Sequence, residues 1–249
     1  MATILIPLPA ADFDPTESAV PSRILSAAGH VPVFATPDGK MGQADARMLT
    51  GKGLGIFAPL LRADANGRQA YAAMQRAPAF RKPIAWDDIR SADFQALLLP
   101  GGHAPGMRPY LESVLLQERC VEFFEQAKPV GTICHGVLLA ARSCTAGGRS
   151  VLFGRKTTAL TRRMELGAWV LTCSWLGNYY RTYARTVQGE ISGLLAAPDD
   201  FITGPGSLRR DSPHDLEAGF TVADGRYLSA RWPGDAHRFA TEFAALCRA

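Results

Sequence analysis

Short, uninterrupted apolar runs alternate along this chain with segments in which apolar residues recur at helical spacing. The run ATILIPLP at residues 2–9 is typical of a strand that is buried on both faces. The segment TESAVPSRILSAAGH follows with a helical pattern and closes on Gly29, a common helix stop. VPVFATPDG at residues 31–39 is predicted to be a second strand that ends in a Pro-Asp-Gly turn. Because strand, helix and strand in this order form right-handed parallel crossovers, the alternation indicates an α/β fold.

The same alternation continues to the end of the chain. Residues 96–99 and 130–133 are predicted to be short buried strands. The segment at 111–127 between them is predicted to be an amphipathic helix, whose inward face is expected to carry Val114, Leu115, Val121 and Phe124. Further elements are expected as strand material at 149–160, a helix at 185–195, a hairpin around Asp224 and Gly225, and a closing helix at 234–249.

Residues 40–90 do not follow this alternation of strand and helix patterns. Their best helical pieces are ADARMLTG at 44–51 and GRQAYAAMQRA at 67–77, so the segment is predicted to be a helical insertion and a candidate lid. A length of 249 residues suits one α/β domain with insertions or two small domains. Since no low-complexity linker or internal repeat divides the chain, we expect one domain over residues 1–249. Its predicted fold is a doubly wound, mostly parallel sheet with helices on both faces.

Composition narrows the expected compartment and partners. Lys and Arg number 27 against 23 Asp and Glu, and the net charge of +4 is scattered instead of forming the dense basic stripe that nucleic-acid binding requires. No apolar run is long enough to cross a bilayer, and the N-terminal apolar stretch has no basic leader and is broken by prolines. Five cysteines without a CxxC pair or regular spacing argue against a disulfide framework. We therefore expect a cytoplasmic protein with reduced thiols that binds neither nucleic acid nor membrane.

Cys134 and His135 lie where a predicted strand gives way to a predicted helix. In a doubly wound sheet the functional crevice lies beyond the carboxyl ends of the strands. A residue in a tight strand-to-helix turn is held in a strained conformation, and the start of the helix favours an anion. Cys134 is therefore predicted to be partly thiolate near neutral pH and nucleophilic. The alternative is a buried cysteine that only packs, which is the usual fate of a free thiol.

Two further stretches are predicted to end at the same edge of the sheet. Gly101 and Gly102 precede His103 in PGGHAPG, and successive backbone N–H groups in such a turn can hold an oxyanion. The alternative for this stretch is an ordinary turn. Glu17 opens the first crossover helix, where an acid in the first turn is favourable by itself. The alternative is that the Glu17 carboxyl points into the crevice and forms a hydrogen bond with Cys134.

These stretches together resemble the ThiJ/PfpI superfamily. The matching positions are Glu17, LLLPGGH at 97–103, TICHG at 132–136 and YLSARWPGDAHRFATEFAAL at 227–246. The resemblance covers most of the chain, although residues 40–90 and 170–215 match only loosely. It implies a flavodoxin-like sheet similar to that of class I glutamine amidotransferases. Within the superfamily the chain is most similar to the branch of heat-inducible chaperones and glutathione-independent glyoxalase III enzymes.

The resemblance to that branch implies a cysteine nucleophile at Cys134, an adjacent His135 and a later acid that orients the histidine. TTALTRRMEL at 157–166 supplies Glu165 for the third role. The competing interpretation is that Glu165 pairs with Arg162 or Arg163 on a helix surface.

The implied reaction converts methylglyoxal into lactate through a hemithioacetal on Cys134. Gly102 and His103 are expected to hold the oxyanion, His135 to move the proton between the two carbons, and Glu17 to tune the thiol. The first alternative function is a cysteine amidase or peptidase-like hydrolase. The second is a non-enzymatic redox-responsive or holdase-type chaperone, in which oxidation of the cysteine is the signal.

The expected ligand is a small carbonyl compound, and no cofactor is implied. The histidines are too dispersed to predict a metal site. The resemblance implies a homodimer, since dimers are common in the superfamily. The segment GNYYRTYART at 177–186 is expected either to line the pocket or to form an oligomer contact. Trp232 and His237 are expected to be structural.

Overall fold

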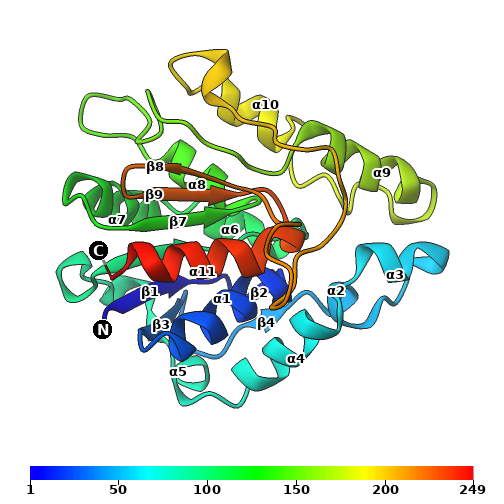
Figure 1. The fold of residues 1–249 in the computed structure, drawn as a ribbon, viewed down its shortest axis with the longest axis horizontal. Coiled ribbons are helices and arrows are strands. Elements are labelled where there is room, and N and C mark those ends of the chain that lie inside the picture. The colour runs from blue at the N-terminus through cyan, green and yellow to red at the C-terminus, as the bar shows by residue number, and fades with distance from the viewer. Residues whose placement is uncertain (249) are drawn as a thin grey trace.

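A seven-stranded sheet forms the centre of the molecule, and the computed structural model describes residues 1–248 (Figure 1). The strand order is β5-β3-β1-β6-β7-β9-β8. All neighbouring strands are parallel except β8 and β9, which form an antiparallel hairpin. The bounds are β1 Thr3–Pro7, β3 Val31–Thr36, β5 Ile84–Ala85, β6 Ala96–Leu99, β7 Val130–Ile133, β8 Thr221–Asp224 and β9 Tyr227–Ala230. The predicted doubly wound, mostly parallel sheet is confirmed.

Helices cover both faces of this sheet (Figure 1). Helices α1 (Pro15–Ala27) and α11 (Ala236–Leu246) pack against each other on one face. The other face carries α6 (Arg108–Leu111), α7 (Val114–Glu125) and α8 (Gly136–Arg142). Because both faces are covered, the central strands are apolar on both sides, and Ile4, Leu5 and Ile6 of β1 have no exposed surface.

The inward face of α7 differs from the predicted one at Val114, whereas the predicted Leu115, Val121 and Phe124 are partly buried against the core. Val114 is 66% exposed, whereas Leu116, Cys120 and Phe123 are buried. Ser113 forms the N-cap by accepting a hydrogen bond from the backbone N–H of Leu116, so the helix begins three residues later than the predicted segment. The prediction placed Val114 inside because helical spacing defines a stripe but does not fix which stripe faces the sheet.

The segment at residues 40–90 is largely helical, as predicted, and packs against the sheet's own helices. It contains α2 (Ala46–Thr50), α3 (Ala58–Leu61), α4 (Ala65–Met74) and α5 (Pro78–Arg81). Helix α4 packs along α1, and α5 packs on β3. The sequence pattern did not reveal three short strands here. β2 (Ala11–Phe13) and β4 (Gln43–Ala44) pair with each other near the end of β1, and β5, which falls inside the predicted helical insertion, adds to the edge of the sheet beside β3.

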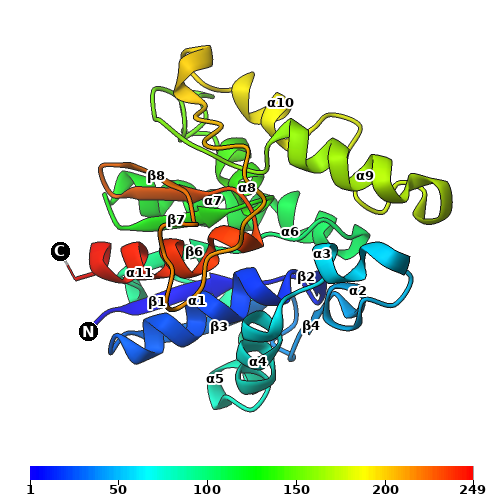
Figure 2. The ribbon, with the colours of Figure 1, turned by 45° about the vertical axis from the view of Figure 1, so that its right-hand side comes forward.

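Residues 149–160 form no strand, which corrects the prediction for this segment. Val151 and Leu152 are buried in the core, but the segment makes only isolated bridges. The next helix, α9 (Arg162–Leu176), projects from the body of the molecule near α3, and α10 (Val187–Ser192) follows it (Figure 2). The position of α9 makes it one wall of the space beyond the sheet.

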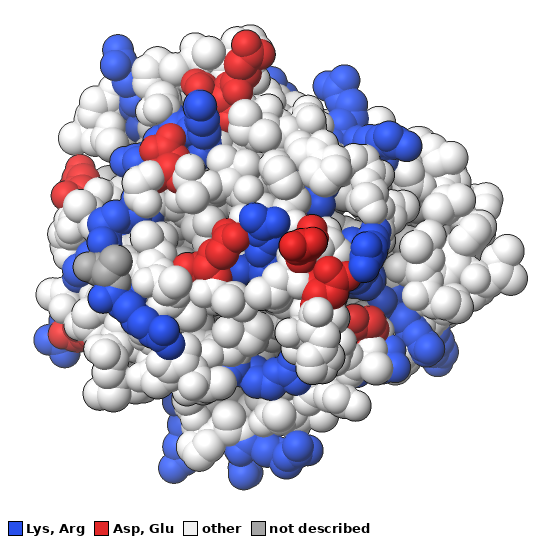
Figure 3. Space-filling model, in the orientation of Figure 1, with Lys and Arg blue, Asp and Glu red and all other residues white. Residues whose placement is uncertain are grey.

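Two further features describe the molecule as a whole. Among the described residues, no helix is both long enough and apolar enough to pass through a bilayer. On the face shown in Figure 3, Lys and Arg side chains are interspersed with Asp and Glu and form no continuous basic stripe.

A fully buried ion pair follows the last parallel strand. Arg231 and Asp235 have no exposed side-chain surface, and their Nη2 and Oδ1 atoms are 2.8 Å apart. Asp235 also accepts a hydrogen bond from the backbone N–H of Phe220 at 2.9 Å. Nearby, Asp211 accepts one from the backbone N–H of Arg238 at 2.8 Å, while its second oxygen is buried without a partner. Burial raises the pKa of Asp211 to about 7.

This raised pKa predicts that Asp211 makes the fold less stable as the pH rises. Unfolded aspartate loses its proton near pH 4, whereas folded Asp211 keeps it to about pH 7, so the folded state binds more protons between these values. We expect Asp211→Asn to be more stable than the wild type by about 2 kcal/mol at pH 8, and by much less at pH 5. Urea unfolding followed by circular dichroism at both pH values tests this. An equal effect at both pH values would contradict the protonation argument.

Candidate active site

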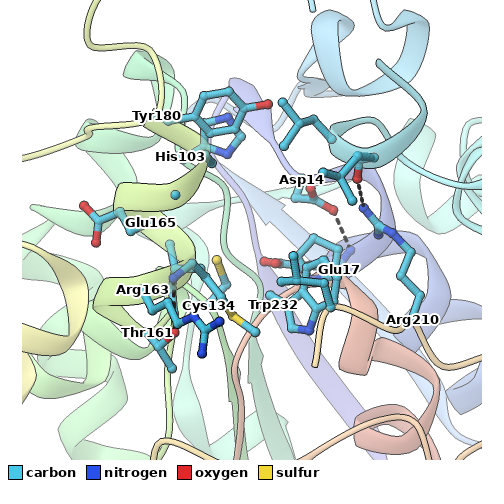
Figure 4. Close-up of a pocket in the computed structure, with 18 of the residues that line it drawn as sticks. Asp14, Glu17, His103, Cys134, Thr161, Arg163, Glu165, Tyr180, Arg210 and Trp232 are labelled. Carbon is cyan, nitrogen blue, oxygen red and sulfur yellow. Dashed lines mark hydrogen bonds between the residues drawn. The ribbon is translucent and has the colours of Figure 1, made fainter. Parts of the chain in front are cut away.

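A cavity of about 590 Å³ opens beyond the carboxyl ends of the central strands (Figure 4). Glu17 reaches it from α1, Gly102 and His103 from the turn after β6, and Cys134 from the turn after β7. The chain order of the strands reverses between β1 and β6, and such a switch point is where doubly wound sheets bind ligands. The structure therefore brings the three predicted stretches together.

The backbone at Cys134 is strained. Its φ angle is 57°, in the left-handed region that a residue with a Cβ rarely adopts and that costs on the order of 1–3 kcal/mol. The following Gly136 permits the sharp turn, because a Cβ at that position would lie 2.2 Å from the carbonyl oxygen of Leu99. The Cys134 N–H still bonds to Ala230 O at 3.1 Å, which ties the turn to β9. The predicted strand-to-helix elbow is present.

The ionisation state of Cys134 differs from the predicted thiolate. The residue is only 5% exposed, and burial together with the charge of Asp14 raises the pKa of its thiol well above the ordinary value. The backbone N–H of His135 opposes this shift, but less strongly. Removing the sulfur from water raises this pKa more than the start of the short helix lowers it. The resting residue is therefore a thiol, and it borders the cavity.

Glu17 is buried completely and lies beside this thiol. One carboxyl oxygen, Oε2, accepts a hydrogen bond from the Gly101 N–H at 2.9 Å. The other oxygen, Oε1, interacts with the Cys134 thiol and has no further hydrogen-bond partner among residues 1–248. Burial and the neighbouring Asp14 raise the pKa of Glu17 well above its ordinary value. The side chain points into the crevice, and the protonated carboxyl can exchange a proton with the sulfur.

Hydrogen bonds fix the tautomer of His135. Thr182 donates its hydroxyl proton to the carbonyl oxygen of His103 at 2.6 Å, so its oxygen accepts from Nε2–H of His135 at 3.1 Å. The unprotonated Nδ1 of His135 then lies 3.4 Å from the sulfur of Cys134. Burial lowers the pKa of His135 to about 3, which makes it a weaker base than the near-neutral one expected from the sequence.

Glu165 does not contact His135, which corrects the geometry implied by the resemblance. Its Oε2 accepts a hydrogen bond from the Val187 N–H at 2.8 Å, and its Oε1 lies 3.3 Å from Nε of Arg181. The side chain is buried in the cavity wall, so pairing with Arg162 or Arg163 on a helix surface is also not observed. Thr182 occupies the place expected for the acid.

The predicted oxyanion site is only partly free. The N–H of Gly101 is committed to Glu17, whereas the N–H of Gly102 has no hydrogen-bond partner among residues 1–248. The ring of His103 stacks on Tyr180, with centroids 4.4 Å apart, and its Nε2 is buried without a partner. Burial lowers the pKa of His103 to about 4, so the ring is neutral. The backbone N–H of His103 is also without a partner among these residues, so the N–H groups of Gly102 and His103 are the donors available for an oxyanion.

The segment at residues 177–186 contributes more to the site than sequence reasoning assigned to it. Thr182 supports His135, Tyr180 lines the cavity, and Arg181 holds Glu165. Of the two roles considered for this segment, the structure supports a place in the pocket wall. Its only signal in the sequence was the density of Tyr, Thr and Arg between two helices. Trp232, expected to be structural, also lines the cavity.

His237 is buried in α11, as expected for a packed histidine. Among residues 1–248, no group of three or more His, Cys, Asp or Glu side chains is arranged to hold a metal ion.

Comparisons with known proteins identify relatives of this chain. A family model described as ThiJ/PfpI family-like matches residues 8–205. A deglycase of Thermococcus kodakarensis is 29% identical over 209 residues, which cover 78% of this chain and 92% of the relative. The deglycase PfpI of Pyrococcus furiosus is 30% identical over 172 residues, covering 66% of this chain and 69% of the relative.

Among solved structures, glyoxalase III from Candida albicans superposes with a TM-score of 0.69 and 18% identity, covering 98% of this chain and 96% of that one. At this identity the match shows the shared fold. The family match, in contrast, spans most of the chain and includes the turns that carry Gly101 and Cys134. The chain belongs to the ThiJ/PfpI-like family.

Proposed function

We propose that this protein is a cysteine-dependent enzyme that converts α-oxoaldehydes into 2-hydroxy acids without glutathione, as in the reaction of methylglyoxal to lactate. The observation that carries the proposal is the thiol of Cys134, which borders a cavity between a protonated carboxyl at Glu17 and the Nδ1 lone pair of His135. The names of the curated relatives and of the glyoxalase III neighbour support carbonyl chemistry at this position.

The first step is addition of the sulfur to the aldehyde carbon. The Glu17 carboxyl donates its proton to the aldehyde oxygen while its other oxygen receives the thiol proton, so a neutral hemithioacetal forms and Glu17 ends protonated. This exchange needs no stable thiolate, which is consistent with the raised pKa of Cys134. The free N–H of Gly102 can donate to the oxygen while negative charge develops on it.

The second step moves a hydrogen from the former aldehyde carbon to its neighbour. Nδ1 of His135 takes the proton from the first carbon as Glu17 protonates the oxygen on the second, giving an enediol. His135 then delivers its proton to the second carbon, and Glu17 recovers a proton from the hydroxyl on the first, which leaves a thioester. Since burial lowers the pKa of His135 to about 3, we expect this transfer to be slow. Water hydrolyses the thioester, releasing the hydroxy acid and the thiol.

A second candidate function is deglycation, the removal of a carbonyl adduct from a larger molecule. It is favoured by the cavity volume of about 590 Å³, which exceeds what a three-carbon aldehyde needs, and by the deglycase names of the sequence relatives. The same Cys134 thiol attacks the carbonyl-derived carbon in this case.

Product analysis with the purified protein tests the proposal. Incubation with methylglyoxal and no added thiol is expected to yield lactate in proportion to enzyme concentration. A methylglyoxal adduct of an amino acid, supplied instead, tests deglycation by release of the free amine. Absence of lactate together with ammonia release from amides, blocked by iodoacetamide, would favour a cysteine hydrolase. Protection of unfolded proteins by the Cys134→Ala variant, without any turnover, would favour a holdase.

Thr182 provides a prediction for the orientation of His135. Thr182→Val keeps the shape of the side chain but removes the acceptor for Nε2–H, leaving a buried donor unsatisfied. We expect kcat for lactate formation to fall about tenfold with little change in KM, because the hydroxyl that accepts from Nε2–H of His135 and donates to the His103 carbonyl is lost while the cavity keeps its shape. Thr182→Ser retains the hydroxyl and is expected to restore most of kcat. Equal loss in the Ser and Val variants would contradict the hydrogen-bond argument.

A further inference from the structure

Two guanidinium groups line the cavity that contains Cys134. Arg163 comes from the first turn of α9, and Arg210 comes from the long segment that precedes β8. In the view of Figure 4 they lie on opposite sides of the cavity. The proposed reaction at Cys134 uses neither of them.

Neither arginine is neutralised by a carboxylate. Among residues 1–248, no Asp or Glu oxygen lies within 4.0 Å of a guanidinium nitrogen of Arg163 or Arg210. Arg210 stacks over Trp232 at 4.9 Å and donates to the carbonyl oxygens of Leu60 and Arg62, both at 3.3 Å. Its Nη1 is buried without a hydrogen-bond partner among residues 1–248. Arg163 is exposed and makes no side-chain hydrogen bond to the described residues.

The acidic side chains of the cavity leave this positive charge largely uncompensated. Glu17 is held protonated by burial, and Glu165 is paired with Arg181. Asp14 caps α1 by accepting from the backbone N–H groups of Thr16 and Glu17. It forms no ion pair within 4.0 Å, but its charge interacts with that of Arg210, so one carboxylate remains in the lining against the two arginines.

The remaining wall is mostly apolar and encloses more space than a three-carbon aldehyde fills. Since a water molecule takes up about 30 Å³, the cavity of about 590 Å³ holds on the order of twenty groups of that size. Apolar side chains from α3, α9, the segment before β8 and the turn after β9 line the cavity together with the arginines: Leu60, Leu61, Leu171, Leu208 and Trp232. Such a cavity suits a ligand with an apolar body and a charged end.

Resting on the proposed carbonyl chemistry at Cys134, we propose that the physiological substrate is an anionic carbonyl compound. Its apolar body fills the cavity, and a carboxylate or phosphate on it is bound by Arg163 and Arg210. Guanidinium groups match both oxoanions because their N–H donors form a planar fork. The uncharged methylglyoxal would engage the thiol without engaging this subsite.

The subsite is testable without turnover, using probes that have no carbonyl to react with the thiol. Isothermal titration calorimetry of the wild type compares phenyl phosphate, 3-phenylpropionate and the uncharged 3-phenylpropanol. We expect the better anionic probe to bind at least about tenfold more tightly than the alcohol, and its identity distinguishes a phosphate from a carboxylate subsite. Arg163→Gln and Arg210→Gln are each expected to weaken anion binding about fivefold and to leave binding of the alcohol unchanged.

Arg162→Gln is the matched control, because it removes the same charge from the neighbouring residue, which does not line the cavity. It is expected to bind all three probes like the wild type. Equal affinity of the wild type for the charged and uncharged probes, or equal loss in the control, would overturn the proposal. Anion binding by the arginines in a protein that forms no hydroxy acid would instead reject the proposed reaction and retain the subsite.

Discussion

Replacement of Cys134 by alanine is expected to reduce lactate formation from methylglyoxal by at least about a thousandfold. Every covalent step of the proposed reaction passes through its sulfur, and no other cysteine lies in the lining of the cavity. Glu17 and His135 retain their places in the variant but have no nucleophile to serve. The measurement is the initial rate of lactate formation, normalised to the concentration of folded protein.

The control for this prediction is Cys144→Ala. Cys144 is a free, exposed cysteine, so its removal deletes the most accessible thiol while leaving the cavity intact. Wild-type rates are expected for this variant. Because the φ angle of 57° strains residue 134, alanine there carries a similar backbone penalty, and stability is expected to change little. Lactate formed equally fast by Cys134→Ala would refute the covalent mechanism.

The protonation states of Glu17 and Cys134 determine the first step of the proposed mechanism. Burial raises the pKa of both Glu17 and Cys134, so proton exchange between them replaces the preformed thiolate that the sequence suggested. A sequence shows which ionisable side chains lie at a turn. The free-energy cost of removing them from water depends on residues that the fold brings in from distant parts of the chain. Asp14, three positions before Glu17, adds to this cost through its own charge.

Local pattern was sufficient to predict the two central strands at 96–99 and 130–133 and the elbow. The first is an apolar run that ends in Pro-Gly-Gly, the second follows Pro129 and ends at the elbow, and these features depend on neighbouring residues alone. At 149–160 the same kind of apolar pattern misled the prediction. Val151 and Leu152 fill the core from a turn, with no strand beside them to complete a ladder.

Helix α9 and the partner of His135 could not be derived from local pattern. Val170 and Trp175 of α9 are 64% and 48% exposed, so the helix has no clean apolar stripe to recognise. The Thr182 hydroxyl reaches His135 across 47 positions of the sequence, and spacing does not encode such a contact. Glu165, chosen by resemblance, lies in the same wall but faces Val187 and Arg181.

The largest expected effect on stability follows from the buried pair beside the cavity. Arg231→Met removes the cation from Asp235, which has no exposed surface and whose pKa is already raised by burial. Breaking such a pair typically costs about 3–5 kcal/mol, because an uncompensated charge remains in the interior. We expect a loss of this size in the free energy of unfolding, measured by urea denaturation at pH 8.

Arg238→Met is the matched control, because its pair with Glu242 has a similar distance of 2.8 Å but is 37% and 39% exposed. Water solvates both of these partners, so the expected loss is below about 1 kcal/mol. The double variant Arg231→Met/Asp235→Asn is expected to be more stable than Arg231→Met alone, since no buried charge then remains, while an amide oxygen can still accept from Phe220 N–H. A double variant less stable than the single one would show that packing around Arg231, and not its charge, holds this end of the cavity together.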